Sequence, residues 1–139
     1  MIIVVVDTSV YVSALVFGGV PRTALEKALK PPYQLAVSHQ IREELVQTLQ
    51  QKFGWPEARI ERAGAMLWAE AQWHAPIEIK AARDPNDNHV LGCALAAEAE
   101  ILISGDKDLL VLHPFRTIAI VTPTQFVALE SPSGSKDHD

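Results

Sequence analysis

Two hydrophobic patterns alternate along the chain. Short apolar runs rich in β-branched residues have no polar face, which is typical of strands inside a parallel sheet. Between these runs, apolar residues recur every three or four positions, as they do in amphipathic helices. The runs predict strands over residues 2–6, 33–37, 76–79, 100–104 and 117–121. We therefore expect an α/β fold: a three-layer sandwich with a central, mostly parallel sheet of about five strands flanked by helices.

Capping residues, glycines and prolines mark the ends of the helices. Ser38 is a favourable N-cap, and Asp84 followed by Pro85 begins a helix in the favoured way. Residues 122–125, with the sequence TPTQ, form a capping box with proline at the first helical position. Together these signals predict helices over about residues 9–17, 21–30, 39–53, 56–71, 85–95 and 123–130.

The length of the chain suits one domain. It has 139 residues, of which 48% are hydrophobic, so it can bury a single substantial core and is not expected to be disordered. We predict one domain over residues 1–130. The sequence SPSGSKDHD at residues 131–139 has the composition of a disordered tail.

Composition disfavours several classes of protein. Cys93 is the only cysteine, which excludes an internal disulfide and disfavours a cysteine-based zinc site. The apolar run after Met1 is too short for a signal peptide or a membrane span, which predicts a cytoplasmic protein with no membrane contact. The net charge of −5 gives no support to nucleic-acid binding by overall charge. The acidic excess is either spread over the surface or gathered in a pocket that holds a cation.

Acidic residues follow the predicted strands or begin the neighbouring helices. Sites in open parallel sheets form outside the carboxyl ends of the strands, so these acids are expected to gather at one edge of the sheet. They are Asp7, Glu43, Glu44, Asp84, Asp87, Asp106 and Asp108.

Some of these acids also have a purely structural interpretation. Asp84 is placed to cap a helix, Asp87 to interact with the helix dipole, and Asp108 to cap the short apolar segment that follows it. Glu43 and Glu44 lie on opposite flanks of the apolar stripe of their helix, so spacing does not choose between them. Asp7 is harder to explain in this way, because a carboxylate directly after five buried residues needs partners or a cation.

A cluster of carboxylates needs positive charge. Two carboxylates about 4 Å apart repel by roughly 4 kcal/mol at an effective dielectric constant of ~20. A hard divalent cation removes this conflict, since Mg²⁺ prefers oxygen ligands and is usually completed by water and substrate phosphates. One or two Mg²⁺ or Mn²⁺ ions bound by carboxylates, without histidine or cysteine ligands, suggest hydrolysis of phosphodiester bonds.

Four segments of the chain resemble the PIN domain family. They are VVVDTSV at residues 4–10, EEL at 43–45, DPNDNHVLGCALAAEAEILISGDKDLL at 84–110, and TPTQF at 122–126. The resemblance is to the stand-alone prokaryotic PIN proteins known as toxins of VapC-type toxin–antitoxin pairs. It implies a metal-dependent ribonuclease with a central parallel sheet, an RNA substrate, a homodimer and a cognate antitoxin protein.

The resemblance also implies roles for individual residues. The family's four catalytic acids correspond to Asp7, Glu44, Asp87 and Asp106. Ser9 stands where the family commonly has asparagine, and Ser104 where it has threonine. The implied metal ligands are Asp7, Asp87 and Asp106, with Asp108 and Asp84 as weaker candidates, and Thr8, Ser9 and Ser104 are implied supporting residues.

Other residues are candidates for binding partners. RNA requires positive charge, and Arg22, Arg42 and Lys107 are the basic residues nearest to the predicted site in the sequence. None of the five histidines is expected to be catalytic. Met66 and Trp68 fall on either side of the apolar stripe of their helix, which suggests a dimer or partner surface.

Two other functions fit parts of the pattern. A phosphorylation-receiver domain also has acids at strand ends, but it needs a lysine after a late strand, where this chain has Thr122–Pro123. A PIN-fold binding module with little turnover is the second alternative. The complete set of acids favours the nuclease over both.

Overall fold

The sheet has five parallel strands, as the hydrophobic pattern predicts. The computed structural model describes residues 1–130, so the tail predicted for residues 131–139 lies outside the described residues. The strands are β1 (Ile2–Val6), β2 (Tyr33–Val37), β3 (Gln72–Trp73), β4 (Ile101–Ile103) and β5 (Ala119–Val121). Their order across the sheet is β3-β2-β1-β4-β5, and every neighbouring pair is parallel. The predicted fold class is confirmed.

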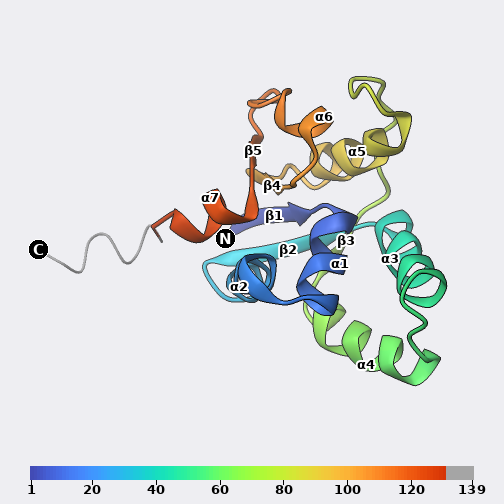
Figure 1. Ribbon diagram of the computed structural model, residues 1–139. Helices are drawn as coiled ribbons and strands as arrows, with labels where there is room; N and C mark the ends of the chain where they lie inside the picture. The colour runs from blue at the N-terminus through green and yellow to red at the C-terminus, as the bar shows by residue number, and fades with distance from the viewer. Residues whose placement is uncertain (131–139) are drawn as a thin grey trace, which may run out of the picture.

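Helices cover both faces of this sheet. They are α1 (Thr8–Val16), α2 (Gly19–Ala28), α3 (His39–Gln51), α4 (Glu57–Trp68), α5 (Asn88–Ala96), α6 (Lys107–Leu110) and α7 (Pro123–Ala128), with a 3₁₀ turn over Pro85–Asp87. Connections between parallel strands are right-handed, so α1–α4 lie on one face and α5 and α6 on the other. Figure 1 shows α5 and α6 above the strands and α1, α2 and α4 below them. Because both faces are covered, Val4, Val5 and Val6 of β1 are fully buried.

Several predicted helix ends are confirmed by their caps. The hydroxyl oxygen of Ser38 accepts a hydrogen bond from the backbone N–H of Ile41, and Thr122 and Gln125 form both bonds of the capping box. Other ends differ from the prediction: α2 begins two residues early, at Gly19, and α4 ends at Trp68 rather than at Ala71. In the part of the chain that the structure describes, no helix is long and apolar enough to cross a membrane.

The strand predicted at residues 76–79 is wrong. The strand that pairs with β2 at this edge of the sheet is β3, which lies earlier in the chain. Residues 76–79 instead cross α5 as an irregular segment. The backbone N–H of Ile77 donates to the carbonyl oxygen of Gly92 at 3.0 Å. A Cβ atom at Gly92 would lie 2.1 Å from the backbone oxygen of Ile77. Glycine at this position therefore lets the segment lie directly on the helix instead of pairing with the sheet.

Gly92→Ala is expected to destabilise the protein, although alanine is the better helix former. Overpacking of this kind costs about 1–3 kcal/mol, which lowers the Tm of a chain of this size by roughly 3–10 °C. Gly64→Ala in α4 is the matched control, because its Cβ would lie at an ordinary 3.4 Å from Trp68. Thermal unfolding of both variants tests this, and equal Tm values for Gly92→Ala and the unmodified protein would contradict it.

Candidate metal and active site

The strand order reverses between β1 and β4, and this is where open α/β sheets bind ligands. Asp7 follows β1, and its backbone N–H donates to the carbonyl oxygen of Ile103 in β4 at 2.9 Å. The Asp7 side chain does not cap α1. Its Oδ2 instead accepts hydrogen bonds from the hydroxyls of Ser104 at 2.8 Å and Ser9 at 3.3 Å. Asp7 is thus held at the reversal point by the chain after β4.

Ser104 connects Asp7 to the next acid. While its hydroxyl donates to Asp7, its oxygen accepts from the backbone N–H of Asp106 at 3.0 Å. Asp106 is the N-cap of α6, and its Oδ1 accepts from the backbone N–H of Asp108 at 2.8 Å. The cap of this helix is therefore Asp106, and Asp108 lies in the first turn. This arrangement brings both carboxylates to the same turn.

A third segment brings Asp87 to the same place. The Asp84 side chain caps the 3₁₀ turn by accepting from the backbone N–H of Asn86 at 3.0 Å. Asp87 ends that turn and makes no capping bond to α5. It is buried, with 8% of its surface exposed, and its Oδ2 has no hydrogen-bond partner among the described residues. A buried carboxylate oxygen without a partner is costly unless a cation compensates it.

The carboxylates of Asp87, Asp106 and Asp108 form a group that fits a metal ion. One oxygen from each lies within 4.8 Å of the other two. All three candidate ligands are oxygens, as Mg²⁺ and Mn²⁺ prefer, and one oxygen of Asp87 lacks a partner among the described residues. Asp7 lies beside this group, not within it, whereas Asp108 is one of its three members.

Crowding of these acids changes their protonation. Burial, together with the nearby carboxylates of Asp106, Asp7 and Asp84, raises the pKa of Asp87 to about 7. Burial also raises the pKa of Asp7, and the hydroxyl groups that donate to it oppose this shift only in part. Near neutral pH Asp87 is thus partly protonated, and a cation that binds to it has to displace this proton.

Glu44 is on α3 and lines the same hollow as Asp7, Asp87 and Asp106. Its Oε1 accepts from the hydroxyl of Thr8 at 2.9 Å, and its Oε2 lies 3.0 Å from Nε2 of His89. The second approach is close but is not aligned as a hydrogen bond, since neither ring nitrogen of His89 has an aligned partner in residues 1–130. Burial tends to raise the pKa of Glu44, but His89 and Thr8 outweigh this and leave the pKa below its ordinary value.

The contact between His89 and Glu44 was not predicted from the sequence. His89 lies two positions after Asp87 on the helix that delivers that acid, but its partner is on α3, 45 positions earlier in the sequence. No spacing within either helix indicates this contact. Glu43, the alternative to Glu44, is exposed and has no contact with Thr8 or His89 among the described residues.

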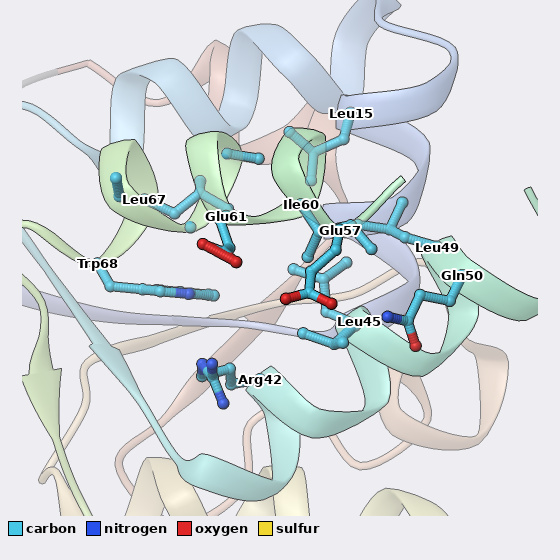
Figure 2. A pocket seen from close by; sticks show the side chains of 14 residues that line it. Leu15, Arg42, Leu45, Leu49, Gln50, Glu57, Ile60, Glu61, Leu67 and Trp68 are labelled. Atoms are coloured by element: carbon cyan, nitrogen blue, oxygen red, sulfur yellow. The ribbon is translucent and has the colours of Figure 1, made fainter. Parts of the chain in front are cut away.

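The basic residues named from the sequence lie apart from one another. Arg22 is on α2, where it pairs with Glu26 at 3.5 Å and is largely exposed. Lys107 is exposed at the start of α6, beside Asp106. Arg42 lines a cleft of about 600 Å³ between α3 and α4, and Figure 2 shows it at the end of the cleft near Trp68. None of the carboxylates of the metal site lines this cleft.

The two residues proposed for a partner surface differ in exposure. Met66 has 57% of its surface exposed. Trp68 is half-buried and packs edge-on against Tyr11 and Trp73, with ring centroids 5.4 and 5.8 Å away. Trp68 therefore contributes to the core, and Met66 is the more accessible of the two.

Comparison with known proteins shows the family to which this chain belongs. A family model described as PIN domain matches residues 3–108, so the chain belongs to the PIN domain family. Members of this family are generally nucleases. None of the curated proteins matches the chain.

A solved structure shares the fold. It is a chain of VapBC2 from Rickettsia felis bound to a DNA fragment from their promoter. The two chains are 13% identical and superpose with a TM-score of 0.60 over 87% of this chain and 98% of the other. At this identity the likeness supports the fold alone.

Proposed function

We propose that this protein is a Mg²⁺- or Mn²⁺-dependent endoribonuclease, the toxin of a toxin–antitoxin pair. The proposal is carried by one observation: Asp87, which has a buried oxygen without a partner among the described residues, lies in a group with Asp106 and Asp108 at the point where the strand order reverses. Membership of a family of nucleases supports phosphodiester hydrolysis at this group. Asp7, Glu44, Asp87 and Asp106 are the proposed catalytic acids.

The side chains of the site have different proposed roles in hydrolysis. Asp87, Asp106 and Asp108 would hold the ion, and the charge of Asp7 would add to their field. Such an ion, when bound, supplies positive charge to the phosphate and lowers the pKa of water. Glu44 is ionised at neutral pH, so its carboxylate can orient a water molecule and accept its proton. Thr8 holds Glu44 in place for this role, while Ser9 and Ser104 hold Asp7.

Partners of this chain are also proposals. The similar structure is a VapBC2 assembly, which supports a cognate antitoxin for this chain. A homodimer that uses the exposed Met66 is proposed as well, and the molar mass from light scattering tests it. The receiver-domain alternative has little support, because the family match is to PIN domains and no lysine follows β5 directly.

Cleavage of a mixed pool of single-stranded RNA tests the proposal against the binding-module alternative. Protein freed of metal with EDTA is expected to cut the pool only after Mn²⁺ or Mg²⁺ is added, and to leave single-stranded DNA of the same sequences largely intact. A lack of RNA cleavage at any metal concentration would leave the chain as a binding module.

Metal affinity is expected to rise with pH. Because the ion has to displace a proton from Asp87, whose pKa is about 7, affinity should increase up to about tenfold per pH unit below 7 and level off above it. Calorimetric titration with Mg²⁺ at pH 6 and pH 8, in buffers of different ionisation enthalpy, gives both the affinity and the protons released. Equal affinities and no proton release would show that the ion binds elsewhere.

A further inference from the structure

A groove leads away from the acids between α1 and α3. It has a volume of about 480 Å³ and is lined at one end by Asp7, Asp87 and Asp106, and at the other by Lys52 and Phe53. It is therefore continuous with the proposed active site, unlike the cleft between α3 and α4.

Two contacts define the ends of this groove. Thr8 on α1 bonds to Glu44 on α3 beside the acids. Nine residues further along each segment, the rings of Phe17 and Phe53 meet edge to face, with centroids 5.9 Å apart. At 1.5 Å per residue, nine helical residues span roughly 13 Å. This length accommodates about four stacked nucleotides at roughly 3.4 Å each.

The chemistry of the lining changes along the groove. Beyond the acids and Glu44 come the neutral hydrogen-bonding side chains of Ser13, Gln47 and Thr48. Lys52 then supplies a cation, and no carboxylate lies within 4.0 Å of it in the described part of the chain. Among residues 1–130 Lys52 has no ion-pairing partner, and a phosphate of a bound ligand can be one.

The aromatic pair at the far end is open to solvent. Phe17 is 75% exposed and Phe53 is 36% exposed. Each ring is followed by a glycine with positive φ, Gly18 at 78° and Gly54 at 64°. The chain turns away after each ring, and both are left at the surface. Exposed aromatic rings next to a cation are what proteins use to bind single-stranded nucleic acid without sequence preference.

We propose that this groove holds the single-stranded RNA next to the scissile phosphate, with Lys52 binding a backbone phosphate and the Phe17–Phe53 pair stacking on a base. This inference rests on the proposed ribonuclease function and adds the subsite that binds the substrate. RNA is favoured over an acidic protein segment, because the groove ends at carboxylates that repel acidic side chains but would hold a cation shared with a phosphate.

Kinetics on two substrates test this subsite. The variants are Lys52→Gln, Phe53→Ala and Phe17→Ala, and the matched controls are Lys30→Gln and Val111→Ala, which change an exposed lysine and an exposed apolar side chain outside the groove. With Mn²⁺, kcat/KM is measured for a single-stranded RNA 10-mer and for bis(p-nitrophenyl) phosphate, which reaches only the metal site. We expect the RNA-to-diester ratio of kcat/KM to fall roughly 5- to 100-fold in the groove variants, mainly through KM for RNA, as for loss of one stacked base.

The outcomes separate the subsite from the ribonuclease function. A conservative Phe53→Trp variant should keep the ratio at or above that of the unmodified protein. If the unmodified protein cuts RNA and the groove variants match the controls, the proposed subsite is overturned, whereas the ribonuclease function stands. The groove would then be a candidate binding site for a protein segment instead of RNA. An equal loss on both substrates also overturns the subsite. Failure of the unmodified protein to cut RNA overturns both proposals.

Discussion

Asp87→Asn is expected to lower metal-dependent RNA cleavage by roughly 100- to 3,000-fold. Asp87 belongs to the group of three carboxylates, and its partnerless Oδ2 is the oxygen that most needs a cation. A bound metal ion contributes several kcal/mol of charge stabilisation in the transition state, about 3–5 kcal/mol, and each 1.4 kcal/mol corresponds to about tenfold in rate. Initial rates on single-stranded RNA at saturating Mn²⁺ measure the loss.

The same variant is expected to be more stable than the unmodified protein when metal is absent. The pKa of Asp87 is raised in the folded state, so its contribution to stability is fully present below the unfolded value near 4 and is lost as the pH rises through about 7. Asparagine is neutral at every pH. The Tm gain of Asp87→Asn should therefore be largest at pH 8 and small at pH 5, as thermal unfolding in EDTA will show.

Asp84→Asn is the matched control for Asp87. The Asp84 side chain accepts a hydrogen bond from Asn86 as a helix cap, and asparagine caps equally well. Cleavage should therefore stay within about threefold of the unmodified protein, since this change removes a peripheral charge and leaves the cap intact. Comparable losses in the two variants would mean that Asp84 is a ligand, or that Asp87 has no special role.

Asp7→Asn is expected to lower cleavage by roughly 100-fold or more while the fold stays intact, because one preorganised negative charge beside the proposed metal site is removed. The asparagine oxygen can still accept from Ser104, so the connection between β1 and β4 survives. Rates on RNA, with far-UV circular dichroism as the check on folding, test this. Turnover comparable to that of the unmodified protein would remove Asp7 from the site.

Ser9→Ala provides the control at this position. The hydroxyl of Ser9 donates to Asp7 at 3.3 Å, which is the longer of the two bonds, and Ser104 remains to hold the carboxylate. The loss of cleavage should therefore be less than about tenfold, in line with a net value of about 1 kcal/mol for one hydrogen bond. A loss as large as that of Asp7→Asn would mean that the hydroxyl acts directly on the substrate.

The sheet was predictable where local sequence and tertiary packing agree. Residues 2–6 have no polar face, and β1 lies at the centre of the sheet with both faces covered. The strand predicted at residues 76–79 failed because its partner is a helix. The alternation of apolar residues there is that of a strand, but Gly92 lets the segment lie on α5, and a periodic pattern carries no information about a glycine on another element.

The candidate site was predictable in its acids but not in its contacts. Asp7 and Asp106 follow strands that end at the same edge, which parallel topology alone indicates. The choice of Glu44 over Glu43 could not come from spacing, because both flank the same stripe. In the structure Glu44 accepts a hydrogen bond from the hydroxyl of Thr8, 36 residues away, which supports its choice over Glu43. Asp108 lies in the group of three carboxylates next to Asp106, which caps α6 by accepting from the backbone N–H of Asp108.

The proposed function depends most directly on whether the group of three carboxylates binds a divalent cation. Titration with Mn²⁺ at pH 8, followed by electron paramagnetic resonance, measures this without any substrate, because bound Mn²⁺ loses the six-line signal of the free ion. We expect saturable binding of one or two Mn²⁺ ions. Mg²⁺ should compete for the same sites, and Asp87→Asn should greatly weaken the binding. A free-ion signal that stays undiminished in the presence of the unmodified protein would contradict the proposed function.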